Sequence, residues 1–366
     1  MVENSRRAVL GGLGAGLAMT LGPARASAAD RKVGYAIVGL GYYATQQIMP
    51  AFASCDRSRL VALVSGTPAK LDTFGDKYDI PASHRYSYGD FDRIRNNPDI
   101  DIVYVVLPNS LHAEYSIRAA QAGKHVMCEK PMAVSVAEGE RMIAAFRQAG
   151  KKLMIGYRSR FEQYNRLAID LARSGHVGPT RIITADHGFP ITAGQWRLDR
   201  SLSGGGSLMD IGIYSLNAAR YLTGEEPVEV SAIESTDRND PRFRTVEDRI
   251  NFLLRFPSGI EAVCVSSYSS SHNSYRVTGT GGWIEMSPAT PYAGQAMSIH
   301  RNGETTPRTL PPGKSQFAGQ LDHLAECVIN DTTPIVPGEE GLADLRVIEA
   351  IYRSAAERRH IALQAM

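Results

Sequence analysis

Cysteine is scarce in this sequence, with four residues in 366. Cys55, Cys128, Cys264 and Cys327 are far apart and show none of the short spacings by which side chains bind a metal. They also lack the density of a disulfide-stabilised fold. We therefore expect neither a metal site nor a disulfide framework.

Long apolar runs and a strong net charge are missing as well. One apolar run of about fourteen residues lies near the N-terminus, and no later run reaches the roughly twenty residues of a membrane-spanning helix. The formal net charge is +2, and residues 1–28 account for it, since they carry three arginines against one glutamate. A remainder near neutrality argues against nucleic acid as a partner and, with the short runs, against membrane insertion.

The first residues form the pattern of an export signal. Arg6 and Arg7 precede the apolar, glycine-rich run, which ends near Leu21 and is followed by the small residues 26–28. This is typical of a twin-arginine signal peptide over residues 1–28, with a disordered basic tail as the alternative. We expect a mature protein that begins near Ala29 and reaches the periplasm already folded.

The length favours two domains after the signal. Strand patterns near 33–38, 60–64, 102–107, 125–128 and 152–156 alternate with helical patterns such as 112–121 and 136–148. This alternation predicts a doubly wound parallel sheet of the Rossmann type over residues 29–156.

The pattern changes beyond residue 156. Helices are expected at 165–174 and 207–222, and strands follow in succession at 181–186, 249–256, 261–267 and 274–280. A Pro-Ser-Gly turn at 257–259 reads as a hairpin. The region 157–366 is therefore predicted to be an α+β domain on an open, mostly antiparallel sheet, closed by packing helices at 320–330 and 341–358. An open sheet favours a homodimer, with a tetramer as the alternative.

A glycine turn after the first strand indicates a dinucleotide site. In G-L-G-x-x-A, Gly39 permits a tight turn, Gly41 lets the backbone approach a pyrophosphate, and Ala44 allows close packing of helix on strand. After the second strand, Ser65 stands where NAD-binding enzymes usually carry an acidic residue, with Thr67 and Lys70 close behind. A hydroxyl and a lysine suit a 2′-phosphate, so the pattern favours NADP; an ordinary strand-helix turn is the alternative.

A second group of residues suggests acid-base chemistry. Lys130, in Glu-Lys-Pro, follows a predicted strand, while Asp210 and Tyr214 are four apart on a predicted helix. A phenol has an ordinary pKa of about 10 and becomes a usable base when an ammonium stabilises its phenolate. Periodicity does not show whether Lys130 and Tyr214 meet.

The motifs together resemble the Gfo/Idh/MocA oxidoreductase family. They are G-L-G-x-x-A, L-P-N-S-L-H at 107–112, C-E-K-P at 128–131, G-Y-R at 156–158, W-R at 196–197 and G-G-G-S-L-M-D-I-G-I-Y at 204–214. The chain is most similar to the exported branch that includes glucose-fructose and aldose-aldose oxidoreductases. A tyrosine at 214, where many members carry histidine, favours that sugar-dismutating branch.

The resemblance implies roles for single positions. Lys130 and Tyr214 would be catalytic, and the substrate would be held by Lys130, Arg158, Asp210 and Tyr214. The cofactor would be held by Gly39, Leu40, Gly41, Tyr42, Tyr43, Ser65, Gly66, Thr67, Lys70, Tyr88, Leu107, Asn109, His112, Glu129, Lys130, Arg158, Trp196, Arg197 and Tyr275. The sequence leaves open that His112 only begins a helix, that Trp196 only fills a cleft, and that Asp210 only orients its own helix.

Two departures limit the resemblance. Tyr42 replaces a lysine within the glycine turn, which puts one phosphate contact in doubt. The segment between the signal and the first strand is short, whereas glucose-fructose oxidoreductase has a longer arm that wraps a neighbouring subunit. The tetramer of that enzyme is therefore not implied.

Export constrains the reaction, because the periplasm offers no pool of free nicotinamide cofactor. We expect NADP to stay tightly bound and to be regenerated in place. In this ping-pong hypothesis one aldose is oxidised at C1 to an aldonolactone, and a second sugar is reduced, aldose to alditol or fructose to sorbitol. The alternatives are an exported glycoside hydrolase that uses NAD and a sugar sensor without turnover.

Overall fold

Two sheets organise residues 31–363, the part of the chain that the computed structural model describes. The predicted signal, residues 1–28, lies outside the described residues. All four cysteine thiols are buried and free. Over the described ranges no helix has the length and apolar character to cross a membrane, and no three side chains of the His, Cys, Asp or Glu type cluster as metal ligands would.

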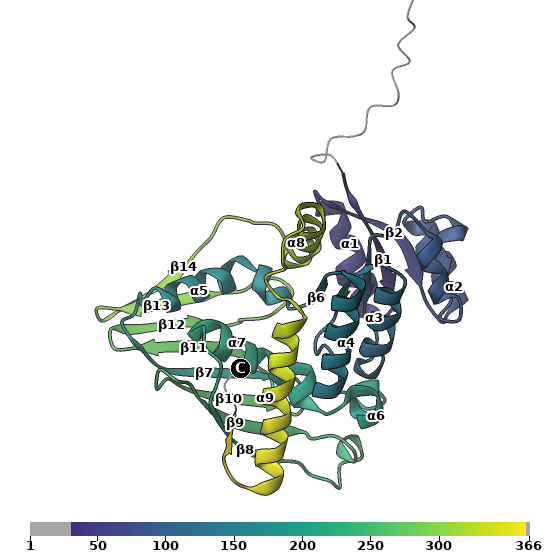
Figure 1. Cartoon of the computed structure of the whole chain (residues 1–366). Coiled ribbons are helices and arrows are strands. Elements are labelled where there is room, and N and C mark those ends of the chain that lie inside the picture. Colours follow the sequence, from purple (N-terminus) through teal and green to yellow (C-terminus); the bar gives the residue numbers. More distant parts are fainter. Residues whose placement is uncertain (1–30, 364–366) are drawn as a thin grey trace, which may run out of the picture. The chain divides into compact units, whose positions relative to one another are not determined.

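Sheet A has six parallel strands in the order β3-β2-β1-β4-β5-β6 (Figure 1). The strands are β1 (Val33–Val38), β2 (Ser58–Val64), β3 (Arg85–Tyr86), β4 (Ile102–Val105), β5 (His125–Cys128) and β6 (Leu153–Ile155). Every residue of β1 is buried, as expected for a strand that is covered on both faces. The strand order reverses between β1 and β4, which opens a crevice at their carboxyl ends. The predicted doubly wound sheet is confirmed.

The helices of this region are α1 (Met49–Ala51), α2 (Pro68–Lys77), α3 (His112–Gln121) and α4 (Val136–Ala149). Local signals set the ends of α4. The Ser135 side chain accepts from the Glu138 N–H, and Gly150 ends the helix at a φ of 62°.

Sheet B has nine strands in the order β14-β13-β12-β11-β7-β10-β9-β8-β15. They are β7 (Thr180–Gly188), β8 (Glu229–Ser235), β9 (Arg249–Arg255), β10 (Glu261–Ser267), β11 (His272–Gly279), β12 (Gly282–Met286), β13 (Met297–Arg301), β14 (Glu304–Arg308) and β15 (Ile361–Ala362). All neighbouring pairs are antiparallel except β7 with β10. The predicted open, mostly antiparallel sheet is confirmed, including the β9–β10 hairpin.

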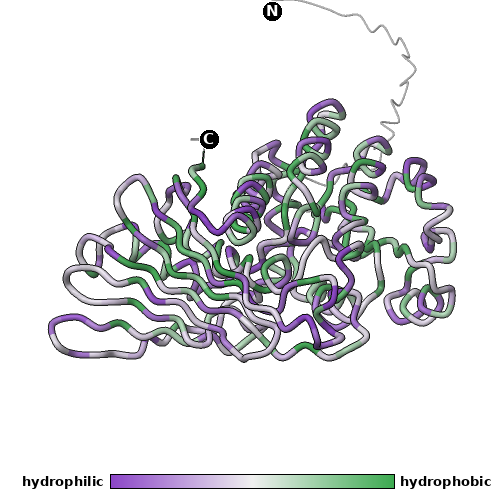
Figure 2. Tube along the Cα trace, turned by 90° about the horizontal axis from the view of Figure 1, so that it is seen from below, coloured by the Kyte–Doolittle hydropathy of each residue, from purple (hydrophilic) through white to green (hydrophobic). Residues whose placement is uncertain are grey.

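One face of sheet B is covered by α5 (Gln163–Arg173), α7 (Ile213–Thr223) and α9 (Gly338–Glu357), as Figure 1 shows. Strand β9 alternates exposed and buried residues, the pattern of a strand with one covered face. Figure 2 shows hydrophobic segments along the strands and hydrophilic ones at exposed turns. The edge strand β14 is exposed throughout and contains Pro307, so it carries no apolar alternation by which sequence could reveal it.

The helices near the C-terminal end of the described chain also contact sheet A. Helix α8 (Gln316–Asn330) receives a hydrogen bond from the buried Tyr35 hydroxyl of β1 at the Leu321 carbonyl, 2.7 Å away. The Asp322 carboxylate of this helix accepts hydrogen bonds from the backbone N–H groups of Asp56 and Arg57 at 2.8 and 2.9 Å. Helix α9 packs on both α4 and β8.

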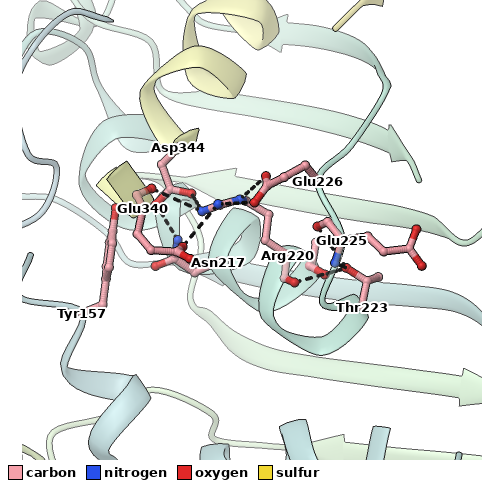
Figure 3. A network of polar contacts seen from close by, with 9 residues as sticks. Tyr157, Asn217, Arg220, Thr223, Glu225, Glu226, Glu340 and Asp344 are labelled. Atoms are coloured by element: carbon pink, nitrogen blue, oxygen red, sulfur yellow. Dashed lines mark hydrogen bonds and ion pairs between the residues drawn. The ribbon is translucent and has the colours of Figure 1, made fainter. Parts of the chain in front are cut away.

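A buried polar network joins α7 to α9 (Figure 3). The carboxylate of Asp344 accepts hydrogen bonds from Asn217 and Arg220, each at 2.6 Å, and from the Tyr157 hydroxyl. Arg220 also pairs with Glu226 at 2.5 Å. Because Tyr157 precedes Arg158 and Asn217 follows Tyr214 on α7, this network supports two segments that reach the candidate site.

Candidate active site

A cavity of about 1140 Å³ opens at the carboxyl ends of the sheet A strands and extends to residues of sheet B and its helices. A cavity of this size accommodates a dinucleotide together with a small substrate. It is lined by Gly39, Leu40, Gly41, Tyr42, Tyr43, Ser65, Gly66, Thr67, Lys70, Tyr88, Leu107, Asn109, His112, Glu129, Lys130, Arg158, Trp196, Arg197, Asp210 and Tyr214, among others. The structure thus brings all but one of the predicted site residues together.

Tyr275 is the exception. It lies on β11 and its hydroxyl donates to Asn165 Oδ1 at 2.9 Å, in a small separate cavity behind Tyr214. The register of β11 turns this side chain to the covered face of the sheet, where it packs in the core.

The glycine turn has the shape that a pyrophosphate requires. Gly39 has a φ of +96°, and a Cβ there would stand 2.2 Å from the Val106 carbonyl oxygen. A Cβ on Gly41 would meet nothing within 4 Å, so this backbone faces the open cavity. The segment that follows begins with a π-helical turn, Ala44–Ile48, rather than the regular helix that the pattern predicts.

The end of β2 carries no carboxylate in the cavity lining. Ser65 Oγ accepts from the Thr67 N–H at 3.1 Å, and Lys70 Nζ donates to the Leu40 carbonyl at 2.9 Å. Lys70 therefore lies against the glycine turn as an exposed cation whose hydrogen-bond partner is neutral. The Ser65 hydroxyl and this ammonium fit the 2′-phosphate of NADP.

The 107–112 segment is held in place by hydrogen bonds of His112 and Asn109. His112 is buried with Nδ1 2.7 Å from the Pro131 carbonyl and Nε2 2.9 Å from the Leu107 carbonyl. Burial lowers the pKa of His112 to about 4, whereas the two carbonyls, which accept from both ring nitrogens only when the ring is protonated, act in the opposite direction. Asn109 donates to the Ser203 carbonyl of α6 (Arg200–Ser203) at 2.8 Å. Both residues therefore shape the cavity wall beside Lys130.

Glu129 extends this wall. The Tyr104 hydroxyl donates to its Oε1, and Gln320 of α8 in turn donates to the Tyr104 oxygen at 2.9 Å. Burial raises the pKa of the Glu129 carboxyl above its ordinary value.

Lys130, Asp210 and Tyr214 meet although 80 residues separate the first two. Lys130 Nζ lies 5.0 Å from the centre of the Tyr214 ring and 3.6 Å from Asp210 Oδ1. It also donates to the Asp210 carbonyl. The predicted pairing of ammonium and phenol is therefore present in the fold.

Asp210 is held by cations rather than capping its helix. Arg197 Nε lies 3.0 Å from Asp210 Oδ2, to which the Tyr268 hydroxyl also donates at 3.0 Å. Burial alone would raise the pKa of Asp210, but Arg197 and Lys130 outweigh it and lower that pKa below the ordinary value. Asp210 lies in a π-helical turn, Leu208–Gly212, which directly precedes α7, so the predicted helix begins irregularly.

Two side chains flank the Tyr214 ring from other directions. The Arg158 guanidinium lies 5.1 Å from the ring centre. The buried His187 ring stacks at 5.7 Å with an interplanar angle of 29°. Ser215 Oγ donates its hydrogen to the Val265 carbonyl at 3.0 Å. His187 Nδ1 lies 2.9 Å from Ser215 Oγ, so Nδ1 carries the proton of the hydrogen bond between these two atoms.

His187 shows no spacing that would mark it in the sequence, and it is expected only to be structural. Burial lowers its pKa to about 3 and keeps the ring neutral beside the phenol. Tyr292, between β12 and β13, also lines the cavity and follows no motif. A pattern of one chain segment cannot reveal either residue, because His187 reaches Tyr214, and Tyr292 reaches Arg158, only through packing between elements.

Comparison with known proteins places this cavity in a family. The model of an oxidoreductase family with an NAD-binding Rossmann fold matches residues 33–157, and the model of the C-terminal alpha/beta domain of that family matches residues 173–363. The chain belongs to the Gfo/Idh/MocA oxidoreductase family. The resemblance predicted from the motifs is confirmed, and residues 33–157 contain a Rossmann domain that binds NAD or NADP.

Individual members of the Gfo/Idh/MocA family match over most of their length. A crystal structure of aldose-aldose oxidoreductase from Caulobacter crescentus, complexed with glycerol, is 64% identical with a TM-score of 0.90, covering 91% of this chain and all (100%) of that one. D-xylose 1-dehydrogenase [NADP(+)] of Haloarcula marismortui is 33% identical over 90% of this chain and 92% of its own. A 3-ketoreductase from Actinomadura kijaniata, in complex with TDP-benzene and NADP, is 26% identical with a TM-score of 0.79, covering 88% and 98%. The chain is thus an oxidoreductase with sugar-oxidising relatives.

Proposed function

We propose that this protein is a sugar oxidoreductase that keeps NADP bound and couples the oxidation of one sugar to the reduction of another. An aldose would be oxidised at C1 to an aldonolactone, and a second sugar would be reduced, either an aldose to an alditol or fructose to sorbitol. The observation that carries the proposal is the contact of Lys130 with Tyr214 in the same cavity as the glycine turn. The similarity to aldose-aldose oxidoreductase supports the choice of substrates.

Residues of the chain manage the proton and the position of the sugar. When bound, NADP supplies the capacity to take a hydride from one carbon and return it to another. Tyr214 accepts the C1 hydroxyl proton of the first sugar and returns it to the carbonyl oxygen of the second. Lys130 and Arg158, both within about 5 Å of the ring centre, place positive charge beside the phenolate that takes the proton and that forms again when the proton is returned. Asp210 is ionised and would accept hydrogen bonds from hydroxyl groups of the sugar.

The proposal is tested by incubating the purified protein with a single aldose and no added cofactor. We expect lactone, or the aldonate that it hydrolyses to, and alditol in equal amounts by mass spectrometry. Lactone without an equal yield of alditol, or turnover only while NADP is continuously supplied, would contradict it.

Replacing Ser65 with aspartate is expected to weaken NADP binding at least about tenfold relative to NAD, because a carboxylate repels the 2′-phosphate and accepts the ribose hydroxyl instead. The measurement is the dissociation constant of each dinucleotide from protein stripped of cofactor. The matched control is Thr73→Asp, which adds the same charge on an exposed side chain of α2. An unchanged preference in Ser65→Asp would remove the argument for NADP.

We propose further that the protein is exported folded to the periplasm by the twin-arginine pathway, on the pattern at residues 1–28. An enzyme that regenerates its own cofactor is suited to a compartment without a cofactor pool. Substitution of Arg6 and Arg7 with lysine should keep the protein in the cytoplasmic fraction; periplasmic recovery that persists after this change would argue against the pathway.

The open face of sheet B supports a homodimer. Ile182, Ile233, Leu253 and Val263 are large apolar side chains exposed on four neighbouring strands, β7, β8, β9 and β10. A contiguous apolar patch of this kind is typical of a contact surface. Light scattering should give the mass of two chains; the mass of four would indicate the tetramer, and that of one would oppose both.

A further inference from the structure

The loop between β12 and β13 crosses from sheet B to the cofactor side of the cavity. Its residue Tyr292 lines the cavity and stands 44% exposed. The Tyr292 ring lies 5.9 Å from the Tyr43 ring, next to the glycine turn, and 5.6 Å from the Phe317 ring of α8. Tyr43 and Phe317 are themselves 6.0 Å apart, so the three rings form a cluster at the wall of the cavity.

The backbone of this loop is anchored by side chains from outside sheet B. Arg158 donates to the carbonyls of Thr290 at 2.7 Å and Pro291 at 3.2 Å. Gln316, at the start of α8, donates to the carbonyls of Pro291 at 3.1 Å and Tyr292 at 2.8 Å. Three successive carbonyls are therefore satisfied, which fixes the loop in the position that brings Tyr292 onto Tyr43.

The same arginine connects the loop to the chemistry. The Arg158 guanidinium lies between the Tyr214 ring, at 5.1 Å, and the Tyr292 ring, at 4.9 Å. Tyr43, Arg158 and Tyr292 line the same cavity as Ser65, Gly41 and Lys130, so a dinucleotide bound along these residues would share the cavity with all three.

We infer that Tyr292 retains the cofactor: its ring closes the cavity beside the glycine turn, and NADP leaves only when the Tyr292 contacts with Tyr43, Phe317 and Arg158 separate. This inference rests on the proposed function, because it assumes NADP at the site. Ring-ring and cation-ring contacts contribute modest free energies when partly exposed. Their joint loss should therefore appear as faster cofactor release rather than as loss of the fold.

The experiment measures NADP carried by the purified protein and its rate of release. Wild type, Tyr292→Ala and Tyr292→Phe are passed through gel filtration, and NADP is quantified after denaturation; release is followed by trapping free NADP with a second enzyme. Tyr292→Ala should release NADP about 10- to 100-fold faster, whereas Tyr292→Phe, which keeps the ring, should stay within about threefold of wild type. Tyr78→Ala, a partly exposed tyrosine outside the cavity lining, is the matched control.

The outcomes separate the two proposals. Wild type without NADP would overturn the proposed function. Wild type with NADP and a Tyr292→Ala variant that releases it equally slowly would overturn only the role of Tyr292. If saturating NADP restores the wild-type kcat to Tyr292→Ala, retention is supported; if it does not, the ring serves the fold or the chemistry and the inference fails.

Discussion

Replacing Tyr214 with phenylalanine is expected to lower kcat for sugar conversion by about 10² to 10⁴-fold, the usual contribution of a positioned general base. The variant keeps the ring that Lys130, Arg158 and His187 contact, but it removes the oxygen that exchanges the proton. Because the hydroxyl has no part in the glycine turn, the purified variant should carry as much NADP as wild type. The measurements are turnover of aldose without added cofactor and NADP content after denaturation.

The matched control for this change is Tyr35→Phe. Tyr35 is a tyrosine whose hydroxyl donates a hydrogen bond to the Leu321 carbonyl. It lies in the core of sheet A, outside the cavity lining. Its loss should lower stability by about 1 kcal/mol and leave kcat within about twofold of wild type. A Tyr214→Phe variant that keeps more than a tenth of the wild-type kcat would show that another group moves the proton.

Replacing Asp344 with alanine is expected to lower the free energy of unfolding by about 3–5 kcal/mol, because it breaks a buried ion pair and leaves two further buried donors without their acceptor. The side chain is fully buried and accepts from Tyr157, Asn217 and Arg220 (Figure 3). The substitution removes the acceptor of Tyr157 and Asn217 and one of the ion-pair partners of Arg220, which keeps Glu226. Urea denaturation of both proteins, each saturated with NADP, measures the difference.

Asp72→Ala is the control for this prediction. Asp72 lies on helix α2 with its side chain 76% exposed, 3.7 Å from Arg85. An exposed ion pair of this kind contributes less than about 1 kcal/mol. If Asp344→Ala costs no more than Asp72→Ala, the network in Figure 3 does not hold α7 and α9 together.

Much of the fold follows from patterns that lie within single segments. The buried run of β1 and the hairpin between β9 and β10 are found where hydrophobic periodicity and turn residues place them. Strand β14 escapes prediction because an exposed edge strand needs no apolar face. The irregular start of α7 escapes prediction for another reason. The π-helical turn at Leu208–Gly212 depends on the packing around it, including the close approach of Gly212 to Ser266.

The residues of the candidate site also fall into two groups, those that a local pattern predicts and those that only packing between segments brings in. The glycine turn and Ser65 could be interpreted from sequence because a positive φ and a missing carboxylate are properties of the local chain. The role of His187 could not, because its contact with Tyr214 joins a strand to a helix. Tyr275 shows the converse, since a position that the resemblance implies does not ensure that the side chain turns toward the cavity.

The order of amino acids was sufficient to predict two kinds of sheet and a dinucleotide-binding glycine turn, and to name NADP as the expected cofactor, because each inference depends on periodicity, backbone conformation or side-chain type within a few residues. The meeting of Lys130, Asp210 and Tyr214, and the contact of Arg158 with Tyr292, arise only when strands, helices and loops from both sheets pack around one space. Contacts between distant segments are set by that packing, which no local pattern encodes.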